Sequence, residues 1–336
     1  MKSKFDAAKP MAVGGQAVLE GVMMRAPGMV ATAVRRANGE IVVKKEANVS
    51  LAEKYPVFKS PILRGAVGLV EMMVIGIRTL NFSAEVAVQD SDGANGANGN
   101  GHLRKTSSSL KESLKLGVTV AFAIVVGVAV FFVKPLPVTT FFFDVDQKPL
   151  WFNLIAGAIR IGLLLGYLLV LSLLKDIKRL FQYHGAEHKA VFAFERGEGL
   201  TVAAASRQSR FHPRCGTSFL LIVMFVAIVL FSVLDLLVMQ WLGHLTVVTR
   251  IATHLPLIPL VGGVSYELIR VSAKRNNTAV GKIVVAPGLW LQKITTKEPD
   301  ESQLEVALAA LRCALGEETK TTLPARIAIL QEASVH

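Results

Sequence analysis

Long runs of apolar residues recur through the chain and predict helices that cross a membrane. Each run approaches the roughly 20 apolar residues that are needed to span a bilayer core. The four runs are Leu116–Val133, Leu150–Leu174, Phe219–Leu242 and Val248–Val271. We therefore expect an α-helical polytopic membrane protein with about four transmembrane helices, and a membrane domain covering residues 111–273.

Several of these runs also contain polar side chains, which are unfavourable in lipid unless they meet a partner or a cavity. Asp235 lies near the end of the third run and Arg250 near the start of the fourth, so we expect these two to pair. The pattern indicates a packed bundle. It also leaves open a small transporter, although no inverted repeat is visible. The polar residues are Arg160, Asp235, Arg250, His254, Glu267 and Arg270.

Shorter patterns predict elements outside the spans. The apolar run between Arg64 and Arg78 is too short to cross a bilayer, so residues 61–89 are expected to form an interfacial or re-entrant helix. Residues 31–47 alternate apolar and polar positions around Asn38-Gly39, which predicts a β-hairpin. Residues 1–60 are therefore expected to be a small cytoplasmic β-containing segment, with no apolar signal sequence at Met1–Pro10.

The two remaining segments differ in composition. Residues 90–110 repeat Ser, Asp, Gly, Ala and Asn without an apolar period, which predicts a flexible linker. Residues 274–336 should form a cytoplasmic C-terminal segment. Within it, Pro299–Gly316 predicts an amphipathic helix because leucines recur on one face. These leucines are Leu304, Leu308, Leu311 and Leu315.

The charge pattern sets the expected orientation. The chain is 52% hydrophobic, has a mean hydropathy of +0.47 and carries a net charge of +12. Basic residues gather beside the spans, which is the topogenic signal of a membrane protein, and no specific nucleic acid is expected. The basic loop 175–218 and both termini should therefore face the cytoplasm.

A His-x-x-Glu-His cluster follows the second span and is the strongest chemical motif. On a helix, His184 and His188 lie on one face and can meet one metal ion. This is the order of an inverted zincin-type motif, in which Glu187 is the catalytic candidate. Two such ligands hold Zn²⁺ or another divalent metal weakly, so a third is required.

A second cluster lies just before the third span, at the same face of the membrane. His212 and Cys215 are both good zinc ligands and sit close together in a turn shaped by Pro213. Arg214 and Arg210 flank the thiol, so redox or nucleophilic thiol chemistry is an alternative. Both clusters also admit a plain reading, in which the imidazoles are hydrogen-bonding anchors and Cys215 is a small buried hydrophobe.

Four further charged residues are candidates for a supporting role. Glu20 and Arg25 in the glycine-flanked stretch from Gly14 to Arg25 could pair with each other or reach the histidines. Glu71 lies in the predicted interfacial helix. Glu267, near the inner end of the fourth span, could pair with Arg270 or contribute to a site.

The motifs together resemble the YqhQ-like family of bacterial membrane proteins. The resemblance rests on GGQAVLEGVMMR at 14–25, SPILRG at 60–65, FQYHGAEHK at 181–189, SRFHPRCGTSF at 209–219 and PGLWLQKITTKEP at 287–299. It implies a multi-pass protein of the bacterial cytoplasmic (inner) membrane. It also implies metal dependence, because the family is labelled as metal-dependent enzymes.

Two hypotheses from different classes follow. The first is a metal-dependent hydrolase at the cytoplasmic membrane interface, acting on a lipid or a membrane-bound peptide. The second is a non-enzymatic scaffold or assembly factor in envelope biogenesis or protein insertion. The scaffold would use its basic face and C-terminal helix to recruit a membrane or cytoplasmic protein partner.

Overall fold

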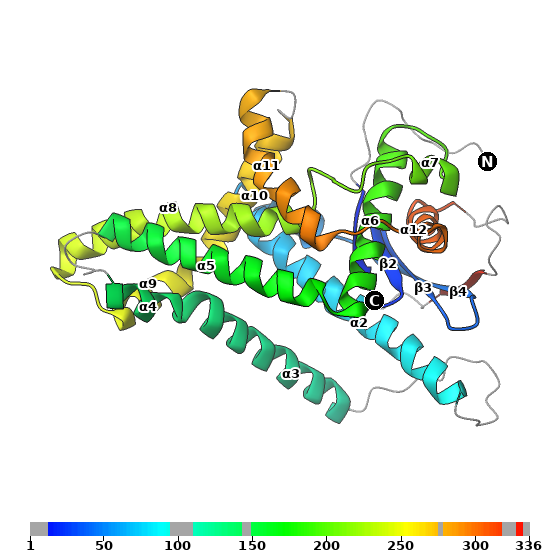
Figure 1. The fold of residues 1–336 in the computed structure, drawn as a ribbon, viewed down its shortest axis with the longest axis horizontal. Helices are drawn as coiled ribbons and strands as arrows, with labels where there is room; N and C mark the ends of the chain where they lie inside the picture. Colours follow the sequence, from blue (N-terminus) through cyan, green and yellow to red (C-terminus); the bar gives the residue numbers. More distant parts are fainter. Residues whose placement is uncertain (1–12, 95–109, 143–148, 275–277, 318–326, 332–336) are drawn as a thin grey trace.

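The fold is described from a computed structural model of the chain. The described residues are 13–94, 110–142, 149–274, 278–317 and 327–331. They form a mostly helical structure with a small β-sheet domain at one end of a group of long apolar helices (Figure 1).

Within the described residues, the sheet has five strands in the order β1-β2-β3-β4-β5. Neighbours are antiparallel except for β4 and β5, which are parallel. The predicted hairpin is confirmed, because Arg35 pairs with Ile41 around a turn in which Gly39 has φ of 86°. The strands are β1 (Gly14–Val18), β2 (Gly21–Ala26), β3 (Gly28–Arg35), β4 (Ile41–Asn48) and β5 (Ile327–Gln331).

The β1–β2 hairpin was not predicted. Its register pairs Val18 with Gly21, so Leu19 and Glu20 alone form the turn. Glu20 adopts a φ of 51°, a conformation that glutamate rarely supplies, so the usual turn signal is missing from the sequence. The glycine-flanked stretch is thus part of the sheet.

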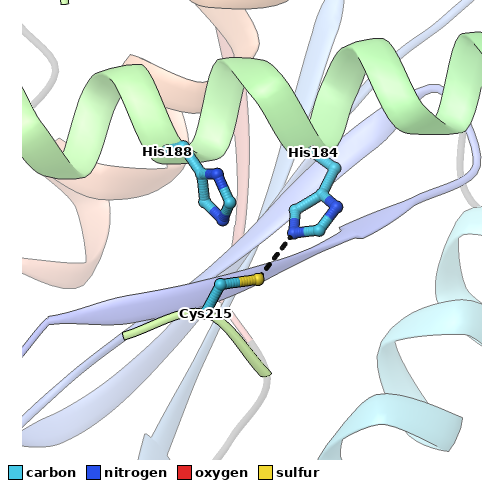
Figure 2. A group of neighbouring side chains, drawn as sticks. All are labelled: His184, His188 and Cys215. Carbon is cyan, nitrogen blue, oxygen red and sulfur yellow. Dashed lines mark hydrogen bonds between the residues drawn. The ribbon is translucent and has the colours of Figure 1, made fainter. Parts of the chain in front are cut away.

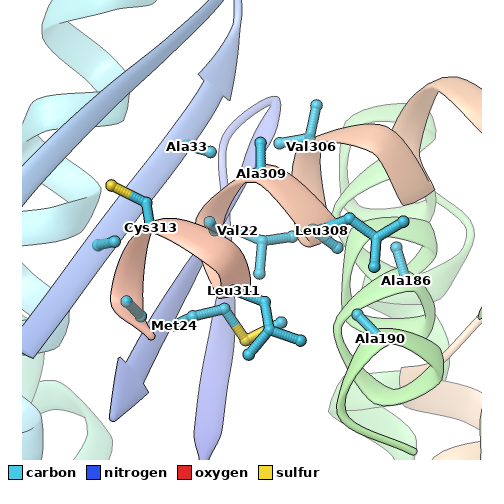
Figure 3. Packing of buried hydrophobic residues seen from close by; sticks show 14 of the residues in the cluster. Val22, Met24, Ala33, Ala186, Ala190, Val306, Leu308, Ala309, Leu311 and Cys313 are labelled. Atoms are coloured by element: carbon cyan, nitrogen blue, oxygen red, sulfur yellow. The ribbon is translucent and has the colours of Figure 1, made fainter. Parts of the chain in front are cut away.

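Helices cover both faces of the sheet. One face packs against α6 (Lys175–Glu195) and α12 (Glu301–Ala314), as Figure 3 shows for Val22, Met24 and Ala33. The other face packs against α2 (Leu63–Ala94) through a second apolar cluster of Val18, Val34, Val42, Phe82 and Val86. The alternation of side chains along each strand supplies an apolar layer to each face.

Helix α12 forms where the sequence predicted a C-terminal helix. Asp300 caps it in a capping box with Gln303, which fixes its start. Its apolar face, which includes Leu304, is buried in the core between the sheet and α6. Figure 3 shows Leu308 and Leu311 of this face. The helix is therefore a core element of the sheet domain.

Among the described residues, four helical segments are long and apolar enough to cross a membrane, at Gly117–Phe141, Leu150–Ser172, Gly216–Leu242 and Val247–Ser272. They correspond closely to the four predicted spans. The first and last are interrupted, the latter by a short 3₁₀ turn that contains Pro256. The elements are α3 (Leu110–Val128), η2 (Ala129–Val133), α4 (Pro135–Phe142), α5 (Pro149–Ser172), α8 (Gly216–Leu242), α9 (Val247–His254), η3 (Leu255–Leu257) and α10 (Ile258–Lys274).

Helix α2 connects the apolar helices to the sheet and extends beyond the end of the helix predicted at residues 61–89. Its first turns pack on α10, where Gly65 lies so close to Gly263 and Tyr266 that a Cβ would not fit. Its later turns pack on the sheet. It also includes residues 90–94 of the predicted linker, whereas residues 95–109 lie outside the described part of the chain.

A further long helix follows α10, and three short helices lie elsewhere in the described part of the chain. The α10 helix is followed by α11 (Ala279–Thr295), which was not predicted, and the two form a hairpin that projects from the side of the long α5 and α8 helices (Figure 1). The short helices are α1 (Leu51–Lys54), η1 (Pro56–Lys59) and α7 (Val202–Ser206).

A buried polar cluster joins three of the apolar segments. Asp235 of α8 pairs with Arg250 of α9 at 3.1 Å, as predicted, and also lies 3.0 Å from His254 Nε2. Asn153 of α5 donates to the same carboxylate at 2.7 Å. All four side chains are buried, so one carboxylate ties together α5, α8 and α9.

The segment between α11 and α12 crosses α6 in close contact. The backbone N–H of Lys297 donates to the carbonyl of Phe181 at 2.8 Å. A Cβ on Gly185 would overlap the carbonyl oxygen of Lys297. Glycine at this position therefore lets the connecting segment lie directly on α6.

Gly185→Ala should destabilise the protein, because its methyl group would push the connecting segment away from α6. We expect a loss of about 1–3 kcal/mol in the free energy of unfolding, measured on detergent-solubilised protein. Gly162→Ala in α5 is the matched control, since nothing lies within 4 Å of its added Cβ. Equal stability of the two variants would contradict the close crossing.

Asp235→Asn keeps the shape of the side chain and removes its charge. We expect it to lower the free energy of unfolding by about 3–5 kcal/mol, because it breaks a buried ion pair. Glu267→Gln is the comparison, since Glu267 pairs with Arg64 in a partly exposed position. That variant should lose no more than about 1 kcal/mol. Equal losses would show that the burial of Asp235 has no special role.

Candidate metal centre

The two histidines of the His-x-x-Glu-His motif lie on one face of α6. Their ring centroids are 4.5 Å apart, and both side chains point toward Cys215 (Figure 2). This follows from their spacing, because residues four apart on an α-helix are neighbours on its surface.

Backbone carbonyls fix the orientation of both imidazoles. His184 Nδ1 donates to the carbonyl oxygen of Thr295 at 2.8 Å, and His188 Nδ1 donates to that of Arg210 at 2.5 Å. A carbonyl oxygen only accepts, so in each neutral ring the proton sits on Nδ1 and the lone pair on Nε2. This is the arrangement in which metal-binding histidines are held by the groups behind them.

Cys215 supplies the third donor atom from the start of α8. Its side chain caps this helix by accepting from the backbone N–H of Thr217. The Sγ atom lies 3.1 Å from His184 Nε2 (Figure 2). Donor atoms of His184, His188 and Cys215 all lie within 4.8 Å of one another.

This spacing suits one metal ion. Donor atoms that share a tetrahedral zinc ion are about 3.3–3.6 Å apart, given Zn–N bonds near 2.0 Å and Zn–S bonds near 2.3 Å. Small side-chain rotations would bring the three atoms to these distances. Two imidazoles and a thiolate are also a donor set that zinc prefers.

The protonation of His188 and the lack of a partner for its Nε2 atom also suit a metal ion. Burial lowers the pKa of His188, although contact with Cys215 acts in the opposite direction, so the ring is neutral near pH 7. Its Nε2 atom is buried and has no hydrogen-bond partner among the described residues. An unpaired buried nitrogen is unfavourable, and a metal ion would satisfy it.

Glu187 lies beside this group rather than in it. Its carboxylate is 3.5 Å from His188 Nε2, and it accepts a hydrogen bond from the backbone N–H of Gly15 in β1. Burial raises the pKa of Glu187 above its ordinary value. The β1 strand approaches closely here, because a Cβ on Gly15 would come within 3 Å of the Glu187 side chain.

His212, predicted as a further metal ligand, does not join the three donor atoms. Its Nε2 atom faces Glu195 at 3.4 Å, and its ring packs on Phe192. Arg214, predicted as a supporting residue, pairs with the same glutamate. Burial alone would raise the pKa of Glu195, but His212 and Arg214 together hold it below its ordinary value.

The other predicted supporting residues lie away from the centre, in ion pairs between elements. Glu20 contacts Arg179 and Tyr183 on α6, so it neither pairs with Arg25 nor reaches the histidines. Arg25 instead lies 3.5 Å from Glu71 of α2. Glu267 pairs with Arg64 rather than with Arg270. Among these residues Glu20 has the most direct link to the site, because Tyr183 precedes His184.

Gln292 of α11 and Thr296, the residue that follows this helix, contact the two clusters and were not predicted as site residues. Gln292 is buried and forms two hydrogen bonds with the backbone of His212, at 2.8 and 2.7 Å, and one with Ser218 at 2.9 Å. Arg210 donates to the carbonyl of Thr296 at 2.5 Å. The motif at 287–299 contains Gln292, Thr295 and Thr296, but its spacing does not indicate these roles.

Comparison with known proteins gives one family. A family model described as a protein of unknown function, DUF1385, matches residues 60–317. The uncharacterized protein YqhQ of Bacillus subtilis (strain 168) is 36% identical over 302 residues, which cover 89% of this chain and 91% of that protein. No solved structure gives a significant match. The motif resemblance is thus confirmed, and this chain belongs to the YqhQ-like DUF1385 family.

Proposed function

We propose that this protein spans the bacterial cytoplasmic membrane several times, with its sheet domain and both termini in the cytoplasm. Four apolar helices and the basic residues at their sheet-side ends support this placement. Trp151 and Trp241 are exposed at the ends of α5 and α8 that lie away from the sheet domain. Aromatic residues commonly mark the membrane surface at such ends. This orientation places the His-His-Cys group at the cytoplasmic membrane interface.

We further propose that the group binds Zn²⁺ and that the protein is a metal-dependent hydrolase at this interface. The observation that carries the proposal is the convergence of His184, His188 and Cys215, whose donor atoms lie within 4.8 Å of one another while carbonyl groups hold the Nδ1 atom of each imidazole. Three protein ligands are typical of catalytic zinc sites, whereas structural sites usually have four. Bound zinc would supply Lewis-acid chemistry there.

The surrounding residues have distinct roles in this proposal. Thr295 and Arg210 orient the imidazoles through their carbonyl groups. Glu187 is the carboxyl group nearest to the His188 lone pair and is the candidate for moving a proton to or from a substrate. The position of Cys215 at the N-cap of α8 puts the site at the end of an apolar helix, within reach of a lipid or a membrane-bound peptide.

The scaffold hypothesis loses part of its basis in this arrangement. It relied on α12 as an exposed recruiting surface, but the apolar face of α12 is buried in the sheet domain. The transporter hypothesis relied on polar residues in the spans. Among these, Asp235, Arg250 and His254 hold one another in a buried cluster, which suits a structural role.

Metal analysis of the detergent-purified protein tests the zinc proposal. We expect about one zinc ion per chain in the wild type and a strong loss in His184→Ala, His188→Ala and Cys215→Ser, because each removes a donor atom. Inductively coupled plasma mass spectrometry gives the content. His244→Ala is the control, since His244 is exposed at the other end of α8.

Two more variants separate ligands from neighbours in the same measurement. Glu187→Gln and His212→Ala should keep the metal, because neither side chain belongs to the group of three donors. Negligible metal in the wild type, or loss of metal in His212→Ala equal to that in His188→Ala, would contradict the proposed ligand set.

Cysteine labelling tests the orientation independently. In a Cys215→Ser/Cys313→Ser background, His244→Cys should react with a membrane-impermeant maleimide added to intact cells. Arg207→Cys, exposed near α7, should react only after the membrane is opened. The reverse pattern would place the sheet domain outside.

A further inference from the structure

Helix α11 has an exposed face that neither the fold nor the metal centre uses. Ile283 is 71% exposed and Trp290 is 67% exposed, although both are large apolar residues. They are seven residues apart, about two helical turns, so they lie on the same side of the helix. Exposed apolar residues aligned in this way indicate an interaction surface.

Basic residues line the edge of this face. Lys282 and Lys293 are both exposed and are eleven residues apart, close to three full turns, so they form a row along α11. This row lies beside the row of Ile283 and Trp290. Arg270, exposed on the neighbouring α10, adds a third cation to the hairpin. A helix with an apolar row and a basic row is typical of binding in the plane of an anionic membrane surface.

The opposite face of α11 is fixed to the rest of the protein. Gly288 lies so close to Ser218 of α8 that a Cβ would not fit between them, and Gln292 bonds to Ser218 and to the backbone of His212. Ser218 belongs to the first turn of an apolar helix, at the end where the metal centre lies. The hairpin therefore leaves the bundle at the level of the membrane interface.

We propose that the exposed face of α11 binds anionic lipid headgroups of the cytoplasmic leaflet. Lys282 and Lys293 would contact the headgroups, and Ile283 and Trp290 would enter the upper acyl region. The inference rests on the membrane placement proposed above but not on the metal. Because the same helix supplies Gln292 and Thr295, lipid binding would hold the support of the metal centre at the bilayer surface.

Tryptophan quenching in vesicles tests this proposal, because the chain has three tryptophans. In Trp151→Phe/Trp241→Phe, only Trp290 reports, and in Trp151→Phe/Trp290→Phe, only Trp241 reports. Each protein is reconstituted with the same fraction of either phosphatidylglycerol or phosphatidylcholine brominated high on the acyl chain. Trp290 should be quenched at least about twofold more by the anionic lipid, since each basic residue near such a surface favours it several-fold.

Charge variants identify the residues responsible. Lys282→Gln/Lys293→Gln should remove the preference of Trp290 for the anionic lipid, and Lys282→Arg/Lys293→Arg should keep it. Trp241, at the opposite end of α8, should show no dependence on these substitutions. Thermal unfolding of the charge variants shows whether each is folded.

The outcomes separate this proposal from the others. Quenching of Trp241 without quenching of Trp290 would overturn the binding of anionic lipid by α11, and so would equal quenching of Trp290 by both lipids. Neither result would contradict the membrane placement. Absence of quenching at both tryptophans would overturn the membrane placement and this inference together. Metal content, measured separately, is unaffected by either result.

Discussion

The close crossing of α6 by the segment that joins α11 to α12 is the constraint on which the rest of the structure depends. It is possible only because Gly185 has no side chain to separate the two backbones. On one side of the crossing, α12 closes the core of the sheet domain. On the other, Thr295 and Gln292 reach the two clusters of the loop between α5 and α8. One glycine between His184 and Glu187 thus links the folding of the sheet domain to the geometry of the candidate site.

The crossing also explains why the elements of the site come from distant parts of the chain. The histidines lie on α6, the cysteine begins α8, and the carbonyl that orients His184 belongs to the end of α11. Each of these points is held by backbone hydrogen bonds or by a helix terminus rather than by a flexible side chain. Rigid support of this kind reduces the reorganisation needed to bind a metal, which is the general benefit of a preorganised site.

Local patterns predicted much of the fold, and tertiary contacts decided the rest. Apolar runs located the four long helices, and Asn38-Gly39 located the β3–β4 hairpin. The β1–β2 hairpin escaped prediction because Glu20 occupies a turn position that usually holds glycine or asparagine. Helix α11 escaped because Pro287 interrupts its pattern and its buried residues include glycine, glutamine and threonine.

In the candidate site too, local spacing predicted some positions and tertiary contacts decided the others. The four-residue spacing of His184 and His188 was enough to place both rings on one face, and Cys215 could be expected nearby because the same loop ends at the next span. The position of His212 could not be predicted from spacing, since Gln292 forms hydrogen bonds with its backbone and Glu195 contacts its imidazole. Ligand types near one another in sequence therefore define a set of candidates, and long-range hydrogen bonds select among them.

Two buried polar clusters in the described part of the chain differ in a way that distinguishes a structural role from a chemical one. The carboxylate of Asp235 meets an amide, a guanidinium and an imidazole from other segments, so the cluster is organised around its own ion pair. His254 does leave Nδ1 without a described partner, but no group of three metal-ligating side chains forms around it among the described residues. At the other cluster, the Nε2 atoms of His184 and His188 converge with Cys215 Sγ, and His188 Nε2 has no hydrogen-bond partner among the described residues. An unpaired nitrogen alone is a local defect in hydrogen bonding, whereas three convergent donor atoms define a position that a cation can occupy.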